Sequence, residues 1–329
     1  MELSQVGEFG LIDLLREGTI VDPRTVVKGI GDDCAVVRAA PGKAELLSCD
    51  MLVEDVHFSW ASITPWQLGY KAVAVNLSDI AAMGGQPRHI VVSLGLPRHL
   101  AVEDVLDLYA GMKEICRVHG VNIVGGDTVS SPVLVINIAI VGEAKLEQIV
   151  YRSGARPGDL LAVTGTLGDS ACGLELLRRG WEDLAGGWKL VLAHLAPQPK
   201  LAAGRALAAA GVSALDDISD GLASETNEIA AASGVGMRVQ ADLVPLSAEL
   251  KAAAVMLGRD PLDFALFGGE DYQLLFTISP DRWSGLPEVL GGEAVTVIGQ
   301  VTPAEEGVMI VYPDGKTAPL APGGYNHFR

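Results

Sequence analysis

The 329-residue chain contains 49% apolar and 20% charged residues, a composition typical of a globular protein with one large domain or two of ordinary size. Its net charge of -17 argues against a general nucleic-acid binder, which needs a basic surface. No apolar stretch predicts a membrane span, the opening MELSQVGEFG lacks a signal-peptide pattern, and the four cysteines are far apart. We therefore expect a cytoplasmic protein with reduced thiols and without a nucleic-acid or membrane partner.

In chain order, short β-type runs alternate with helical patterns through the first half of the sequence. Runs rich in Val, Ile and Leu predict strands at 44–50, 89–97, 121–127 and 133–144. The pair Thr64-Pro65 predicts a helix start, and this helix should run to Gly84-Gly85. A second helix is expected from about 102 to 119, closed by Gly120.

A Gly/Pro-rich turn at 152–159 predicts a boundary, after which the pattern begins again. A strand at 160–165 leads through a Gly-rich turn at 166–173 into a helix, and more helices precede a strand at 273–279. Late strands are expected at 295–301 and 308–312. The pattern indicates an α+β protein with an N-terminal domain over 1–148 and a C-terminal domain over 149–329.

Carboxylates recur beside glycine at the ends of the predicted strands. Turns favour Asp because its side chain bonds nearby backbone amides, so each acid alone has a structural explanation. Recurrence at strand ends is more informative, since such ends commonly form ligand sites. The acids concerned are Asp32, Asp33, Asp50, Asp127, Asp216, Asp217, Asp220, Glu270 and Asp271.

Asp79 lies in the apolar helical stretch YKAVAVNLSDIAAMGG and is expected to be buried. A buried ionised carboxylate is costly unless it is paired or bound to metal. Lys71 lies eight residues earlier on the same helix face and is a candidate partner. An ion pair with Lys71 and a metal-ligand role therefore both stay open for Asp79.

Convergence of several of these acids would require cations. Two unit charges about 4 Å apart repel by roughly 4 kcal/mol at an effective dielectric constant near 20. The acids offer oxygen ligands without an accompanying His/Cys cluster, which favours Mg²⁺ over Zn²⁺. Because Mg²⁺ held by carboxylates commonly serves substrate phosphates, the pattern suggests a nucleotide site.

Three further features each have two interpretations. The strand, Gly-rich turn and helix of VTGTLGDSACGLELL (163–177) would suit either phosphate binding or tight packing. Arg152, at the predicted boundary, is either a phosphate clamp or a surface arginine, and His57 is either a packed or a functional histidine. GIGDDC lacks the third glycine of a dinucleotide-binding fingerprint, which excludes that interpretation.

The motifs together resemble the thiamine-monophosphate kinase family, part of the ATP-binding superfamily that includes aminoimidazole ribonucleotide synthase. They occur in the order GIGDDCAV, SCDMLVEDVHF, YKAVAVNLSDIAAMGG, GGDT, RSGARPGDLLAVTGTLGDS, DISDGL, GGEDYQLLF and GYNHF. The resemblance spans almost the whole chain. It implies a two-domain aminoimidazole ribonucleotide synthase-like fold, with an N-terminal mixed-sheet domain that pairs in a homodimer and a C-terminal α/β domain.

The resemblance also implies an activity: ATP, as co-substrate, would phosphorylate thiamine phosphate to thiamine diphosphate with the help of several Mg²⁺ ions. Implied metal ligands are Asp33, Ser48, Asp50, Asp79, Asp127, Asp217 and Asp220. Implied ATP contacts are Gly126, Asp127, Arg152 and Ser219, and implied contacts to thiamine phosphate are His57, Glu270 and Tyr325. Two positions depart from the family pattern. Cys49 stands where Thr is common and is left out of the ligand set, and Asn326 replaces a frequent Asp.

No general base is assigned, because the acceptor phosphate is mostly a dianion at neutral pH. Two other functions stay open on the sequence. One is an ATP-dependent ligase or synthase of the same superfamily that acts on another substrate. The other is a non-catalytic nucleotide- or metal-binding protein whose acids hold structural ions.

Overall fold

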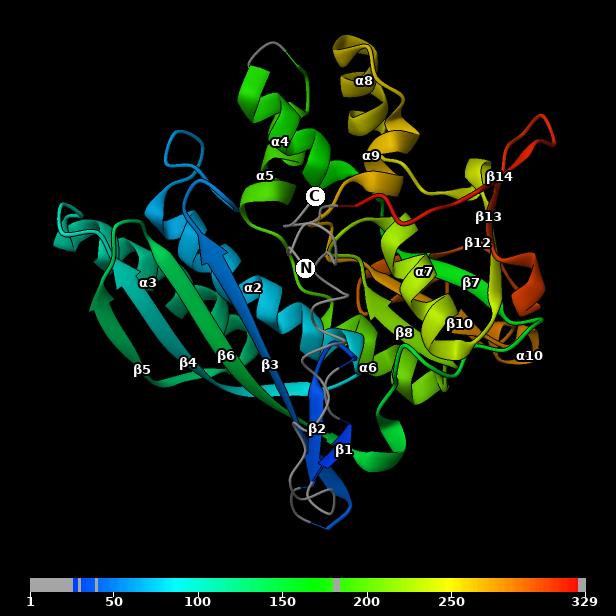
Figure 1. The fold of residues 1–329 in the computed structure, drawn as a ribbon, viewed down its shortest axis with the longest axis horizontal. Coiled ribbons are helices and arrows are strands. Elements are labelled where there is room, and N and C mark those ends of the chain that lie inside the picture. The colour runs from blue at the N-terminus through cyan, green and yellow to red at the C-terminus, as the bar shows by residue number, and fades with distance from the viewer. Residues whose placement is uncertain (1–25, 29–30, 39–40, 180–183, 325–329) are drawn as a thin grey trace, which may run out of the picture.

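The computed structural model describes residues 26–28, 31–38, 41–179 and 184–324, which form two β-sheets with associated helices (Figure 1). Tyr325, one of the predicted substrate contacts, lies outside the described residues. Among the described helices, none has the length and apolar character needed to cross a bilayer.

The first sheet has six strands in the order β1-β2-β3-β6-β4-β5. Its longest pairing joins β3 to β6 antiparallel, from Lys43↔Lys145 to Val53↔Val135, whereas β4 and β5 run parallel. The strands are β1 (Val26–Lys28), β2 (Ala35–Arg38), β3 (Lys43–Val53), β4 (Gln86–Leu96), β5 (Asn122–Ser130) and β6 (Val135–Lys145).

Helices α2 (Pro65–Ala82) and α3 (Val102–His119) belong to the same half. The start of α2 is fixed by a capping box, in which Thr64 Oγ1 accepts from the Gln67 N–H and Gln67 Oε1 accepts from the Thr64 N–H. The two helices cross closely at glycines: a Cβ on Gly111 would lie 1.9 Å from the Trp66 carbonyl oxygen. The crossing therefore depends on the absence of a side chain.

The second sheet has eight strands, seven of them in the order β14-β13-β9-β12-β7-β10-β8, with β11 paired to β12. It is antiparallel except where β13 pairs with β9. Its strands are β7 (Leu160–Thr164), β8 (Ala214–Asp217), β9 (Gly236–Gln240), β10 (Leu274–Ile278), β11 (Val289–Leu290), β12 (Glu293–Thr302), β13 (Val308–Val311) and β14 (Thr317–Pro319).

The remaining helices lie in the second half of the chain. They are α4 (Asp169–Arg179), α5 (Gly187–Leu195), α6 (Leu201–Ala210), α7 (Leu222–Ser233), α8 (Ala248–Leu257), α9 (Pro261–Phe267) and α10 (Pro280–Trp283). Short 3₁₀ helices occur at Leu146–Gln148, Ala241–Leu243 and Ala304–Glu306.

Helix α2 lies between the two halves and contacts both (Figure 1). It packs on β3 and β6 of the first sheet and on α6 and β8 of the second half. A Cβ on Gly204 of α6 would lie 2.1 Å from the Ala81 carbonyl oxygen of α2, so these helices touch backbone to backbone. One cluster of buried apolar side chains runs through α2 into both halves, which explains why nearly every face of this helix is apolar.

The α+β fold predicted from the sequence is confirmed, and the long predicted elements match the structure closely. The prediction missed β1, β2, β8, β9, β11 and β14, which have two to five residues each. Strand β8 has the sequence ALDD and is fully buried. It was missed because Asp is uncommon in strands and two of its four residues are Asp.

Candidate metal and phosphate site

Three carboxylates predicted as metal ligands meet where the two halves join. Asp33 comes from the turn between β1 and β2, Asp79 from α2 and Asp217 from the end of β8. One carboxylate oxygen of each lies within 4.8 Å of those of the other two. Segments far apart in the sequence thus provide one compact set of oxygen atoms.

Hydroxyl and amide side chains hold these acids in place. Ser48 of β3 donates to Asp79, and Ser78 of α2 donates to Asp217. The backbone N–H of Asp50 donates to Asn76 Oδ1 at 3.2 Å, and Asn76 Nδ2 donates to the Ala72 carbonyl oxygen at 3.0 Å. The middle of β3 and the acid-bearing face of α2 are therefore fixed to each other.

Burial and mutual repulsion shape the charge of this cluster. Burial, with the nearby Asp33 carboxylate, raises the pKa of Asp50 to about 6 and that of Asp217 to about 8. Burial and the Asp50 carboxylate also raise the pKa of Asp79 well above its ordinary value. Without a cation, Asp217 is therefore largely protonated at neutral pH.

The cluster has the chemistry of a hard-cation site. Among the described residues, the Oδ2 atoms of Asp33, in the cluster, and of Asp216, next to Asp217, are buried without a hydrogen-bond partner, an arrangement that a bound cation would satisfy. The donors are carboxylate oxygens, which suit Mg²⁺. The residues present therefore fit the predicted metal.

The Arg152 side chain places a positive charge beside the cluster. Its guanidinium contacts three carboxylates: Asp33 at 2.5 Å, Asp216 at 3.0 Å and Glu228 at 2.6 Å. Of the two sequence interpretations, the surface arginine is wrong, since the Arg152 side chain is 21% exposed and pairs with three acidic side chains. The Asp32 carboxylate accepts a hydrogen bond from the Asp33 N–H and forms an ion pair with Lys28, so it stabilises the turn.

Two glutamates of α7 shape the site although the sequence analysis missed both. Glu228 pairs with Arg152, and burial raises its pKa to about 7. Glu225 is 1% exposed and accepts from the Asp220 N–H at 2.7 Å and from Ser219 Oγ at 3.4 Å. It thereby fixes the turn that carries Ser219 and Asp220, the predicted ATP and metal contacts. The sequence carries no clear signal for Glu225 and Glu228, since α7 also contains Ser224, Thr226 and Asn227 and looks like an ordinary half-exposed helix.

The GGED segment forms a strained loop beside the cluster. Glu270 has φ +66°, and its N–H donates to the Ser219 carbonyl oxygen at 2.6 Å. Its carboxylate pairs with Lys71 of α2 at 2.9 Å and with His194 Nδ1 of α5 at 3.1 Å. Lys71 was a candidate partner of Asp79, and this alternative is wrong because Lys71 pairs with Glu270.

The Gly-rich turn before α4 already binds a carboxyl group from its own chain. The Asp271 carboxylate accepts from the Gly168 N–H at 2.6 Å and from the Ser170 N–H at 3.3 Å. These are backbone donors at the start of a helix, the groups that a phosphate would use. Of the two sequence interpretations for this turn, the structure supports tight packing.

Other predicted site residues are not members of the three-carboxylate cluster. His57 is in the turn after β3, where its Nδ1 accepts from the Val53 N–H at 3.0 Å. Gly126 and the exposed Asp127 lie on β5, three strands from β3, which is about 14 Å at the usual strand spacing. Asp127 pairs in register with the exposed Ser93. The predicted roles of these residues stay predictions.

Gly126 itself has a clear backbone requirement. It has φ +156°, and a Cβ there would lie 1.8 Å from the Val92 carbonyl oxygen. Any other residue would push β5 away from β4.

Comparisons with known proteins agree with this arrangement. Residues 31–144 match the family model "AIR synthase related protein, N-terminal domain", and residues 156–312 match the corresponding C-terminal domain. Thiamine-monophosphate kinase of Bacillus subtilis is 38% identical over 98% of this chain and 99% of its own length. That of Aquifex aeolicus is 40% identical over the full length of both.

Solved structures give the same result. The structure of AaThiL complexed with AMPPCP and TMP superposes with a TM-score of 0.88 at 40% identity, covering 99% of each chain. Hydrogenase maturation protein HypE in complex with ATP, at 23% identity and a TM-score of 0.72, shares the fold. With both domains matched and close relatives aligned from end to end, the chain belongs to the thiamine-monophosphate kinase family within the AIR synthase-related proteins.

Proposed function

We propose that this protein transfers the γ-phosphoryl group of ATP to thiamine phosphate, giving thiamine diphosphate and ADP. The observation that carries the proposal is the convergence of Asp33, Asp79 and Asp217 beside Arg152. An acid cluster with an embedded guanidinium suits cations and phosphate groups together. Support also comes from the relative AaThiL, whose structure holds AMPPCP and TMP.

The metal ligands of the proposal are the three clustered acids with Ser48 and Asp50 of β3, and with Asp127 and Asp220 as predicted from the sequence. Bound Mg²⁺ ions would supply the positive charge that lets two phosphate groups approach each other. Cys49 stays outside this set, since its exposed thiol accepts from Asn137 Nδ2 at 2.9 Å.

Arg152 would contact ATP phosphates without leaving its place. Its three carboxylate partners take at least three of the five guanidinium N–H donors, so up to two can face a phosphate oxygen. Ser219 and Gly126 are the further proposed ATP contacts. Glu225 would act on ATP binding through the turn that presents Ser219.

The acceptor oxygen needs no strong base, because a phosphate monoester is mostly dianionic at neutral pH. The proposed task of the protein is therefore to align two anions and screen their repulsion. His57, Glu270 and Tyr325 are the proposed contacts to thiamine phosphate.

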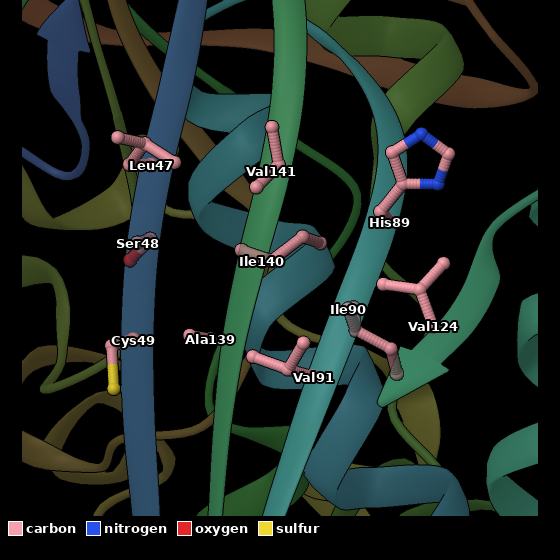
Figure 2. A pocket seen from close by; sticks show the side chains of 10 residues that line it. All are labelled: Leu47, Ser48, Cys49, His89, Ile90, Val91, Val124, Ala139, Ile140 and Val141. Atoms are coloured by element: carbon pink, nitrogen blue, oxygen red, sulfur yellow. The ribbon is translucent and has the colours of Figure 1, made fainter. Parts of the chain in front are cut away.

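We further propose that the protein forms a homodimer through the first sheet. The sheet face opposite α2 carries exposed apolar side chains, including Met51, Val91 and Val124 at 51%, 40% and 59% exposure. Figure 2 shows a shallow pocket on this face, lined by side chains of β3, β4, β5 and β6. A second copy would cover this surface. A Val91→Glu variant should then sediment as a monomer, whereas the wild-type protein should sediment as a dimer.

Two smaller predictions also stay proposals. The division into domains at 1–148 and 149–329 is supported by the change of sheet, since β6 ends at Lys145 and β7 begins at Leu160. A cytoplasmic location is supported by the four cysteines, all of which are free.

The decisive experiment incubates purified protein with ATP, thiamine phosphate and Mg²⁺ and identifies the products by chromatography. We expect equimolar ADP and thiamine diphosphate, and none when thiamine phosphate is omitted. Thiamine diphosphate without ADP, or ADP release independent of thiamine phosphate, would contradict the proposal. A non-catalytic binding protein would form neither product.

A further inference from the structure

Lys71 is a fully buried ammonium group on the helix that carries part of the acid cluster. Its side chain is 1% exposed, although lysine is almost never buried without a partner. It lies seven residues before Ser78 and eight before Asp79, so all three project from one face of α2. At 1.5 Å per residue, Lys71 stands about 10–12 Å along the helix from the cluster.

The partner of Lys71 is Glu270, which belongs to the second half of the chain. Lys71 Nζ lies 2.9 Å from both carboxylate oxygens of Glu270. His194 Nδ1 lies 3.1 Å from Glu270 Oε2, and Ser170 Oγ lies 3.2 Å from the same ring nitrogen. Because an ionised carboxylate only accepts hydrogen bonds, His194 must carry its proton on Nδ1.

These contacts keep Glu270 charged and in a strained conformation. Burial alone would raise the pKa of Glu270, but Lys71 and His194 hold that pKa below its ordinary value. The left-handed backbone of Glu270 and of Tyr272, at φ +49°, is unfavourable for these residues and needs support from their surroundings. Burial raises the pKa of Tyr272 well above its ordinary value, and the Glu270 and Asp50 carboxylates raise it further.

The Glu270 carboxylate can still accept a further hydrogen bond. A carboxylate has about four acceptor positions, of which Lys71 takes two and His194 one. Among the residues that the structure describes, no other donor takes the remaining position, on a side chain that is 27% exposed. It would suit a single N–H donor of a ligand.

We propose that Lys71 and His194 are positioning residues that fix the Glu270 carboxylate at a set distance along α2 from the metal cluster. The site would then select an acceptor whose length places a phosphate at the cluster and an amino-substituted ring at Glu270. Thiamine phosphate has this form, with a phosphate at one end and an aminopyrimidine at the other. The inference rests on the proposed function and assigns to Lys71 and His194 the selection of the acceptor.

The first test compares Lys71→Met with a matched control, Lys200→Met. Lys200 also pairs with a glutamate, at 2.8 Å from Glu293; both glutamate side chains are 27% exposed, whereas the lysine side chains are 10% exposed in Lys200 and 1% in Lys71. Loss of a charged hydrogen bond should raise the KM for thiamine phosphate about tenfold or more in Lys71→Met, with the KM for ATP changed less than about twofold. Lys200→Met should leave both constants near wild type.

A second test asks whether Lys71 acts through Glu270. Glu270→Gln and the double variant Lys71→Met/Glu270→Gln should have the same KM for thiamine phosphate, because the lysine has no carboxylate left to position. Lys71→Arg, which keeps the charge, should restore part of the affinity. The double variant also avoids an unpaired buried charge, so it serves if Lys71→Met does not fold.

The third test uses an acceptor analogue that lacks the pyrimidine amino group. Wild-type protein should prefer thiamine phosphate over this analogue in kcat/KM, and His194→Gln and Lys71→Met should reduce that preference. Equal loss for both acceptors, additive effects in the double variant, or an unchanged KM for thiamine phosphate would each overturn the inference. If the wild-type protein does not phosphorylate thiamine phosphate at all, the proposed function fails instead.

Discussion

Replacing Asp79 with Asn should stabilise the metal-free protein and weaken its response to Mg²⁺. The oxygens of Asp33, Asp79 and Asp217 lie within 4.8 Å of one another. At that distance, each fully ionised pair repels by about 3.5 kcal/mol at an effective dielectric constant of 20, or roughly 10 kcal/mol for three pairs. This repulsion is comparable to the whole stability of an ordinary domain, about 5–15 kcal/mol.

The neutral amide introduced by Asp79→Asn would remove two of the three repelling pairs while keeping an oxygen for Ser48, which donates to Asp79 in the wild-type protein. Protonation already relieves part of the repulsion, because the pKa of Asp79 is raised by burial and by Asp50. The net gain should therefore be smaller than the roughly 7 kcal/mol of two full pairs, and on the order of 1–3 kcal/mol near pH 8.

The assay is urea unfolding followed by circular dichroism, with EDTA and then with Mg²⁺ in excess. The variant should unfold at a higher urea concentration than wild type in EDTA, and the order should reverse in Mg²⁺. Ser62→Ala, whose hydroxyl donates to the Ser59 carbonyl oxygen in an exposed turn, is a control that should leave the Mg²⁺ response intact. A less stable variant in EDTA, or equal stabilisation of both proteins by Mg²⁺, would refute the reasoning.

Three further predictions follow from the geometry. In EDTA, the free energy of unfolding of the wild-type protein should fall as pH rises from about 4 to 8. The pKa of Asp217 is raised to about 8 in the folded state, so between these pH values the folded state binds a proton that the unfolded state has lost. A urea midpoint that rises over this range would contradict the burial argument. Gly111→Ala should destabilise by about 1–3 kcal/mol, since its Cβ would lie 1.9 Å from the Trp66 carbonyl oxygen, whereas Gly285→Ala, whose nearest neighbour would be 3.7 Å away, should be nearly neutral in thermal unfolding. Arg152→Lys should lower kcat/KM for ATP at least about tenfold, because one ammonium cannot contact three carboxylates and a phosphate together; a change below about twofold in steady-state kinetics would exclude that role.

The long elements could be predicted because their signals are local. Thr64-Pro65 gave the start of α2, and Gly120 gave the end of α3 in a left-handed conformation. The gathering of acids was a reasonable hypothesis because one buried Asp on an apolar helix needs a partner or a cation.

Partnerships across the chain could not be predicted in the same way. Lys71 finds Glu270 at a separation of 199 residues, while the sequence offered Asp79 as its neighbour on the same helix. In the sequence, Glu225 and Glu228 look like solvent-facing helix acids. In the structure, Glu225 is buried and Glu228 pairs with Arg152. The Asp271 contact to the turn before α4 depends on two loops that meet only in the folded protein.

The position of α2 between the two halves limits how the site can open. A hinge between the halves would separate Gly204 from the Ala81 backbone, pull Lys71 away from Glu270 and expose the shared apolar cluster to water. Each of these losses opposes large domain rotation. Ligands should therefore be admitted by the movement of surface segments over a rigid frame, so that the spacing between acids and Glu270 stays the same before and after binding.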